Sequence, residues 1–366
     1  MRLSKKRSRS ALAALVGIAA ATLLSVGAVP NPAKDPVGAE IARWSEFLKS
    51  NKSSDEMWKQ AKEATEPVIA RADEAYRKGR RFLALQRLAA AGVNLSGSQY
   101  LQALSPAAHT DAGFEAEWKR MGEVLRADLR TPPPAALAGV QPAVVRAMGE
   151  AALPQVRIFY DASLEYGRNT MPDAGLFYIG SARAQRDFAA FCRRISSPAS
   201  KPAPPLRSLA GEIDRLEGEM LAAYKPPASI DNHRDFILSH AALKEARELD
   251  AAGLRYGSLL RYLQAAQRFA PLRKAPAQLS GPALGKRLDE IDAQLASQRF
   301  DDSIGRLFVE AARDEAAGGE GRSPATAAIL ASDVLPRYFA AFEPATPVAP
   351  KPAPRVTVTL VRWPYT

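Results

Sequence analysis

Apolar residues recur at three- and four-residue steps along most of the chain, which is the period of an amphipathic helix. Ser53, Ser54 and Asp55 stand before one such stretch, where short polar side chains cap a helix. Strand-like alternation is nearly absent before the last dozen residues. The pattern predicts an all-α protein of antiparallel helix hairpins, packed as an α-α superhelix or bundle, with a short extended C-terminal tail.

The predicted helices are separated where proline and glycine cluster. Pro67 is expected to kink or split the second helix, and Gly92 to end the third. The predicted spans are 37–48, 55–78, 80–91, 112–129, 140–152, 156–166, 175–195, 206–224, 232–252, 256–269, 281–298, 301–316 and 324–342.

Proline-rich stretches suggest how the chain is divided. A linker at 198–205 would separate a helical region at 29–197 from a second one at 206–343. Residues 344–354 would form an extended spacer, and residues 355–366 a strand-like tail. That tail, which includes Trp363, could add to a partner's sheet or fold back on its own chain.

The first residues have the layout of an export signal. Arg2, Lys5, Lys6, Arg7 and Arg9 are followed by an uncharged run at 11–29. Small residues place the expected cleavage between Ala28 and Val29, so that residues 1–28 would be removed. The alternative is an uncleaved anchor, because nineteen uncharged residues approach the ~20 that span a bilayer. Both predict a periplasmic or extracellular protein, with membrane contact only through this segment if it is uncleaved.

The charge of the chain changes once that signal is set aside. The formal net charge is +11, and removing the five basic residues leaves about +6. Lys and Arg alternate with acids along the helices, which indicates solvated helix faces and argues against nucleic-acid binding.

Two stretches, at about 68–95 and 242–270, share one spacing of small and large residues. The first set matches the second at a constant offset: Ala72, Ala75, Gly79, Phe82, Ala84, Leu85, Leu88 and Ala91 with Ala246, Leu249, Gly253, Tyr256, Ser258, Leu259, Tyr262 and Ala265. This spacing resembles a degenerate tetratricopeptide repeat, with Val68 and Ala242 where that family has an aromatic residue. The resemblance implies an α-α superhelix whose concave face binds peptides or proteins.

Reactive residues do not form a recognisable constellation. His233 and His240 are about 10 Å apart along a helix, too far to share a metal ion, and His109 is remote in sequence. The single cysteine, Cys192, has no nearby histidine, and no glycine-rich loop has the phosphate-binding pattern. Glu150, Glu165, Glu212 and Glu217 lie on amphipathic helices. We therefore expect no metal, no cofactor and no catalytic residues.

Aromatic residues concentrate in the middle of the chain, and most are expected to form core. If a groove exists, Tyr160, Tyr166 and Tyr178 are the binding candidates, because tyrosine combines contact area with a hydrogen-bonding hydroxyl. The sequence favours an exported, non-enzymatic helical scaffold for an envelope protein or peptide. A peptidoglycan- or polysaccharide-acting enzyme and a periplasmic small-molecule binding protein stay open as alternatives.

Overall fold

The computed structural model describes residues 35–130, 141–168, 171–195, 201–272, 279–319 and 321–343. These residues form helices and connecting loops with no strand among them, which confirms the all-α prediction. The signal-like segment, with Ala28 and Val29, and the tail, with Trp363, lie outside the described residues.

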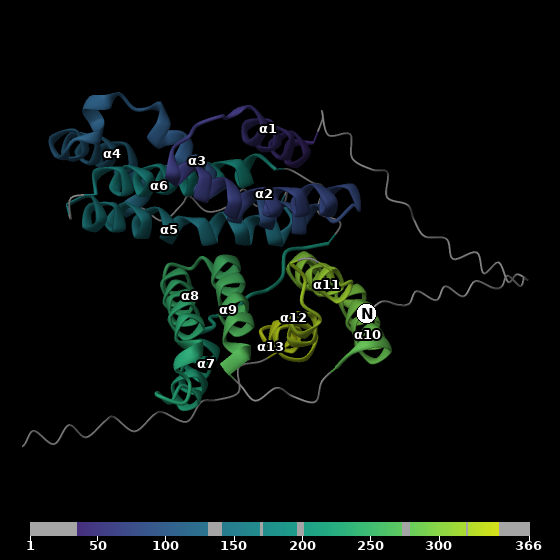
Figure 1. Cartoon of the computed structure of the whole chain (residues 1–366). Coiled ribbons are helices and arrows are strands. Elements are labelled where there is room, and N and C mark those ends of the chain that lie inside the picture. Colours follow the sequence, from purple (N-terminus) through teal and green to yellow (C-terminus); the bar gives the residue numbers. More distant parts are fainter. Residues whose placement is uncertain are drawn as a thin grey trace, which may run out of the picture.

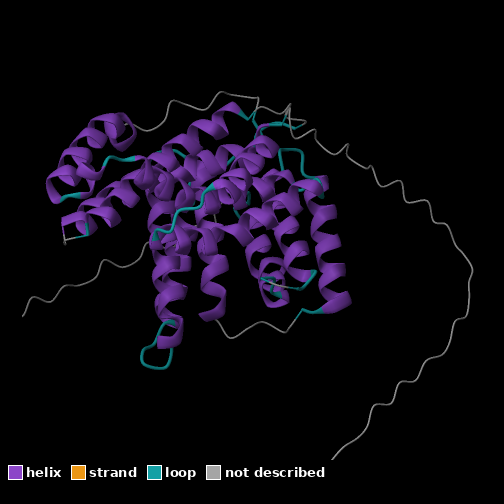
Figure 2. Cartoon of the chain, turned by 45° about the horizontal axis from the view of Figure 1, so that its top comes forward, coloured by secondary structure: helices purple, strands orange, loops and turns teal. Residues whose placement is uncertain are grey.

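The helices form two blocks that lie one above the other in Figure 1. The upper block holds α1 (Pro36–Ser50), α2 (Glu56–Arg77), α3 (Arg81–Ala103), α4 (Asp111–Arg130), α5 (Ala143–Arg168) and α6 (Pro172–Arg194). The lower block holds α7 (Ala210–Ala223), α8 (His233–Ala251), α9 (Arg255–Phe269), α10 (Gly281–Ser297), α11 (Ser303–Ala316), α12 (Pro324–Ile329) and α13 (Leu335–Ala340). Short 3-10 helices at Pro106–His109, Ile230–Asn232 and Ala270–Leu272 and a π-helix, η4 (Leu330–Val334), complete the helical structure (Figure 2).

Proline does not interrupt two helices where the sequence suggested a break. α5 runs continuously through Pro154, although two helices were predicted there, and α2 is not split at Pro67. An internal proline costs a helix about 3 kcal/mol. α5 packs along α6 on one side and α9 on the other, and this burial outweighs the local cost. The N-cap prediction is confirmed, since Asp55 Oδ1 accepts the backbone N–H of Trp58 at 2.8 Å.

α3 does not end at Gly92 as predicted but continues to Ala103. One glycine of this helix, Gly97, lies at a close packing contact. A Cβ on Gly97 would lie 2.9 Å from the side chains of Phe177 and Ser181 of α6, and a Cβ on Gly180 of α6 would lie 3.0 Å from the Cα of Gly97. The two helices therefore cross at a pair of glycines, and nothing larger fits there without a shift.

The two stretches with matching spacing form two helix hairpins, α2–α3 and α8–α9, with the same turn. Gly79 and Gly253 have positive φ angles of 75° and 78°. The backbone N–H of Arg80 donates to the carbonyl of Ala75 at 2.9 Å, and that of Leu254 to the carbonyl of Leu249 at 2.8 Å. This bond defines a Schellman-type end, for which glycine is preferred. Apart from the two exposed turn glycines, the matching small residues are buried in both hairpins.

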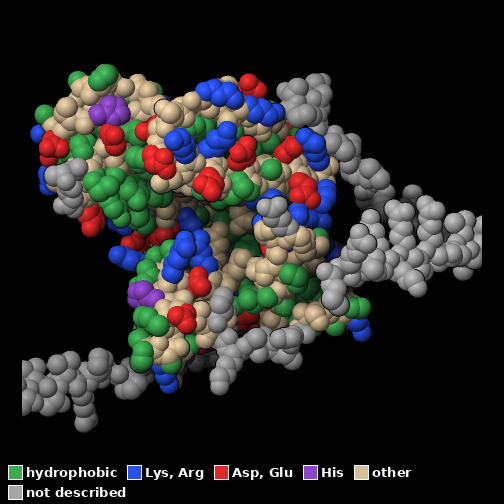
Figure 3. All heavy atoms as spheres, viewed as in Figure 1, with side chains coloured by type: hydrophobic (Ala, Val, Ile, Leu, Met, Phe, Trp, Pro, Cys, Tyr) green, Lys and Arg blue, Asp and Glu red, His purple; other side chains and the backbone are tan. Residues whose placement is uncertain are grey.

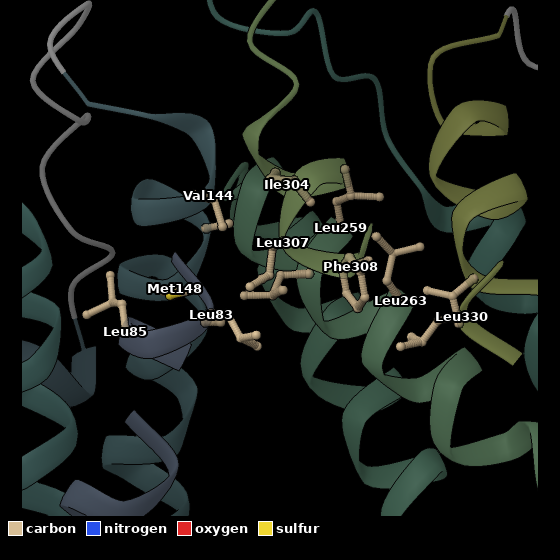
Figure 4. Packing of buried hydrophobic residues seen from close by; sticks show 14 of the residues in the cluster. Leu83, Leu85, Val144, Met148, Leu259, Leu263, Ile304, Leu307, Phe308 and Leu330 are labelled. Atoms are coloured by element: carbon tan, nitrogen blue, oxygen red, sulfur yellow. The ribbon is translucent and has the colours of Figure 1, made fainter. Parts of the chain in front are cut away.

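One hydrophobic core joins both blocks. Figure 4 shows side chains of α3 and α5 facing those of α9, α11 and η4. They belong to one cluster that includes Leu83, Met148, Leu263, Phe308 and Leu330. A smaller cluster lies between α4, α5 and α6, with Phe114, Met121 and Leu176 among its members. The upper block is thus held on the lower one by shared packing.

Hydrogen bonds hold the segment that connects the two blocks, in the part of it that the structure describes. Pro204 is buried, and its carbonyl accepts the hydroxyl of Tyr256 at 3.1 Å. The carbonyl of Pro202 accepts the N–H of Asp301 at 2.7 Å, and Asp301 in turn accepts the N–H of Ala143 at the start of α5 at 2.8 Å. These hydrogen bonds fix the position of the connecting segment against both blocks.

Candidate functional site

A groove of about 540 Å³ lies between α1, α3 and α6. Its α3 side runs from Leu88 to Ala103, about 22 Å at 1.5 Å per residue. The lining residues of α6 fall on one face of that helix, from Gly180 to Arg194. Pockets of this volume are the usual size of ligand sites in proteins.

The groove is lined by both small residues and aromatic rings. Ala89, Gly92, Val93, Ser96 and Ala184 supply small side chains from the two long helices. Larger aromatic side chains come from all three helices: Trp44 of α1, Tyr100 of α3, and Phe188 and Phe191 of α6. Phe188 and Phe191 pack against the core yet stay half-buried, so part of each ring faces the groove. The small residues leave space for the backbone of a bound chain, and the aromatic rings offer apolar contacts to its side chains.

The charged residues of the groove are mostly basic. Arg43 lies with its guanidinium carbon 3.8 Å from the centre of the Trp44 ring and pairs with Glu40. Arg183 pairs with Asp187 at 3.5 Å, and Arg194 stacks 5.8 Å from the ring of Phe191. Cations held against aromatic rings keep a fixed position and remain able to meet an anion.

The groove corresponds to a gap in the outermost layer of the upper block. α1 packs on α3 at one end, and α4 packs on α6 at the other. Figure 1 shows α1 and α4 at opposite ends of the block, with α3 and α6 beneath and between them. At the α4 end of the groove, the hydroxyl of Tyr100 donates to Glu117 of α4. The two covering helices thus border the groove without filling it.

The three predicted tyrosines lie in two different places. Tyr166 and Tyr178 stack with ring centres 4.8 Å apart, and Phe159 lies 6.2 Å from Tyr178. Tyr160 is buried between α4 and α5, stacks on Trp118 at 5.2 Å, and donates its hydroxyl to the Trp118 carbonyl. By helical period, Tyr178 lies on the side of α6 roughly opposite the groove.

Tyr166 and Tyr178 form a partly exposed aromatic surface, because Tyr166 is 44% exposed and Tyr178 is half-buried. Figure 3 shows a hydrophobic patch near the ends of α5 and α6 on the left, among interspersed basic and acidic side chains. Tyr166 and Tyr178 were binding candidates from the sequence, whereas no residue of the groove was. The groove arises from residues of three helices that are far apart along the chain.

The most concentrated charge cluster is an ion network around Asp314 of α11. This carboxylate is 2% exposed and pairs with four arginines: Arg71, Arg80, Arg87 and Arg322. Burial raises the pKa of Asp314, but hydrogen bonds from Arg87 and Arg71 outweigh that effect and hold the pKa well below its usual range. The arginines come from α2, the turn before α3, α3 itself and the loop before α12, so the network joins the two blocks. We assign this network a structural role, since each of its charged groups already has a partner.

The candidate reactive groups are engaged in local contacts. His233 shares a hydrogen bond of 2.6 Å with the Tyr224 hydroxyl, His240 one of 3.1 Å with Glu217, and His109 one of 2.6 Å with Asp173. In the part of the chain that the structure describes, no cluster of His, Cys, Asp and Glu could hold a metal ion.

The buried thiol and two of the glutamates also have structural roles. Burial raises the pKa of the Cys192 thiol to about 12, so it stays protonated at neutral pH. Glu150 accepts the N–H of Gly257 at 2.8 Å and the Nε–H of Arg146 at 2.8 Å. Burial raises the pKa of Glu212, but the hydrogen bond from Arg207 reverses this, so the pKa is lowered. A general acid needs a raised pKa, and Glu212 has the opposite shift.

No protein family, characterised protein or solved structure matches the chain. Among the helices of the described residues, none combines the length and the apolar character that crossing a membrane requires. The arguments for function therefore come from the groove and from the sequence.

Proposed function

We propose that this chain is an exported, non-enzymatic helical scaffold that binds an envelope protein or peptide in the groove between α1, α3 and α6. The observation that carries the proposal is the groove itself, with aromatic rings and arginines set along a floor of small residues. Tryptophan, tyrosine and arginine are the side chains that contribute most to protein interfaces. The resemblance of the two hairpins to tetratricopeptide repeats points to the same class of function.

The groove has the rigid support that a binding surface needs. α3 and α6 meet at the Gly97 and Gly180 crossing, and α6 packs along its length on α5. Trp44 is buried and contacts Phe47 edge to face at 5.6 Å, which fixes the wall made by α1. A preformed surface binds without the entropic cost of ordering its own helices.

Crosslinking from inside the groove tests this proposal. A photoreactive residue placed at Ser96, which lines the groove, is compared with one placed at Tyr178 on the other side of α6. In the cells that make the protein, we expect a discrete adduct with another protein from position 96 and none of the same mass from position 178. Adducts that are identical from both positions, or none from position 96, would contradict the proposal.

Export is tested separately. We expect the mature protein outside the cytoplasm, with Val29 as its first residue, because the basic start and the uncharged run at 11–29 fit a cleaved signal. N-terminal sequencing of the fractionated protein measures this directly. Full-length chain in the cytosolic fraction would contradict it.

The deletion of residues 344–366 addresses the tail. If the tail binds a partner, the shortened chain keeps its melting temperature and loses the partner; if the tail folds back, the melting temperature falls. Thermal unfolding of both forms distinguishes the two outcomes.

A further inference from the structure

We infer that the occupant of the groove is an acidic amphipathic helix of another protein. This inference rests on the proposed function and specifies the chemistry of the partner. It follows from the shape of the groove, from its apolar residues and from its charges, in that order.

The shape fits a helix. A groove about 22 Å long matches a helix of about 15 residues, and α-helices pack side by side at 8–10 Å between axes. The small residues at Ala89, Gly92, Ser96 and Ala184 leave the space that a helix axis at that distance requires. Because α1 and α4 already cover the two ends of this layer, an added helix would continue the layer between them.

The apolar residues define one face of that helix. Phe188 and Phe191 of α6 and Leu88 of α3 line the part of the groove nearest to Trp44. Apolar side chains that recur at three- and four-residue steps on the partner would insert between these rings, as in other helix-in-groove complexes.

The charges along the α6 edge of the groove indicate which side chains should flank the apolar face of the partner helix. Arg183 lines the groove and Arg186 lies just outside it, and both pair with the same carboxylate, that of Asp187, at 3.5 and 3.1 Å. In the described part of the chain, Arg194 meets the ring of Phe191 and no acid. The α6 edge of the groove therefore carries more positive than negative charge, and carboxylates on the partner would complement it.

A selection from a peptide library tests the inference. Random peptides about 16 residues long, displayed on phage, are selected on the full chain purified from its own cells. We expect enriched peptides with a net negative charge and apolar residues at helical spacing. Free peptides of these sequences should gain helical circular dichroism when the protein is added.

Matched variants show whether the peptides occupy the groove. Ala89→Trp fills the groove and should abolish binding, whereas Ala90→Trp, on the neighbouring exposed position outside the groove, should leave it unchanged. Arg194→Glu should weaken binding about tenfold or more, and Arg193→Glu, an exposed neighbour outside the groove, by less than about twofold. Circular dichroism of each variant verifies that it is folded.

Several results would overturn the inference. They are the enrichment of basic or proline-rich peptides, equal weakening by the two arginine variants, the lack of any peptide sensitive to Ala89→Trp, and a dimer of this chain that Ala89→Trp dissociates. If these results accompany a discrete adduct from Ser96 with another protein, the proposed function stands and only the acidic helix is wrong.

Discussion

Glu310 of α11 is a carboxyl group whose burial makes stability depend on pH. Its Oε2 atom is buried and has no hydrogen-bond partner within the described residues. Burial raises the pKa of Glu310 to about 7, in spite of the charge of Arg80 and the backbone N–H of Leu83. The folded protein thus holds a proton that the unfolded chain releases near its ordinary pKa of 4.5. The stabilisation that comes from the higher pKa of Glu310 in the folded protein is complete below about pH 4.5 and is lost as the pH rises through about 7.

Replacing Glu310 with Gln should remove this dependence. We expect Glu310→Gln to be more stable than the original protein at about pH 8, on the order of 2 kcal/mol, and equally stable at about pH 4. Urea unfolding at both pH values measures the difference. Glu290→Gln, on the exposed side of α10, is the control for removing one acidic charge. An equal effect of Glu310→Gln at both pH values would show that packing, and not ionisation, is responsible.

Asp314 has the opposite dependence. Because its folded pKa lies below the ordinary value of 3.8, its contribution is present above that pH and is lost as the pH falls further. Asp314→Asn leaves four arginines without their shared anion, so we expect a loss of about 3 kcal/mol at neutral pH. The loss should shrink as the pH falls below about 3.8. A neutral effect at pH 7 in urea unfolding would show that the arginines find other partners.

At the scale of elements, the glycine crossing between α3 and α6 sets the position of the groove. A Cβ on Gly180 would lie 2.6 Å from the Cβ of Tyr100, which is closer than real side-chain contacts. Gly180→Ala should therefore push the helices apart and cost about 1–3 kcal/mol. Gly218→Ala in α7 is the matched control, since nothing lies within 4 Å of its Cβ, and it should stabilise the protein by up to about 1 kcal/mol. Thermal unfolding compares the two, and equal effects would contradict the tight crossing.

The elements also show what could be predicted from the sequence. The all-α class, both glycine turns and the cap at Asp55 follow from local patterns, and each of them is present in the structure. The helix break predicted near Pro154 and the helix end predicted at Gly92 were wrong, because both residues locally favour the end of a helix. Packing of α5 between α6 and α9, and of α3 against α6, outweighs those tendencies, and a single sequence does not reveal which helices meet.

The groove could not be predicted for the same reason. Phe188 and Phe191 look like core residues in the sequence, and they are partly exposed because they line the groove between α1, α3 and α6. The cap on α5 is a further example, since Asp301 reaches Ala143 from the other block. Tyr166 and Tyr178 were proposed from the chemistry of tyrosine alone, and the structure stacks them on each other, away from the groove.

At the scale of the whole molecule, the two blocks act as one scaffold. The shared core, the Asp314 network and the pinned segment near Pro204 join them. A partner bound in the groove should therefore change the upper surface locally without rearranging the blocks. Rigid support of this kind keeps the groove open in the unbound protein.

Hydrogen exchange of the protein alone and with its crosslinked partner tests the central claim most directly. We predict that slowing of amide exchange is concentrated in the end of α1 near Trp44, in 88–103 of α3 and in 180–194 of α6, with no change in α7 and α8. Slowing that is confined to the Tyr166 and Tyr178 side of α5, or that is spread equally over both blocks, would contradict the groove as the binding surface.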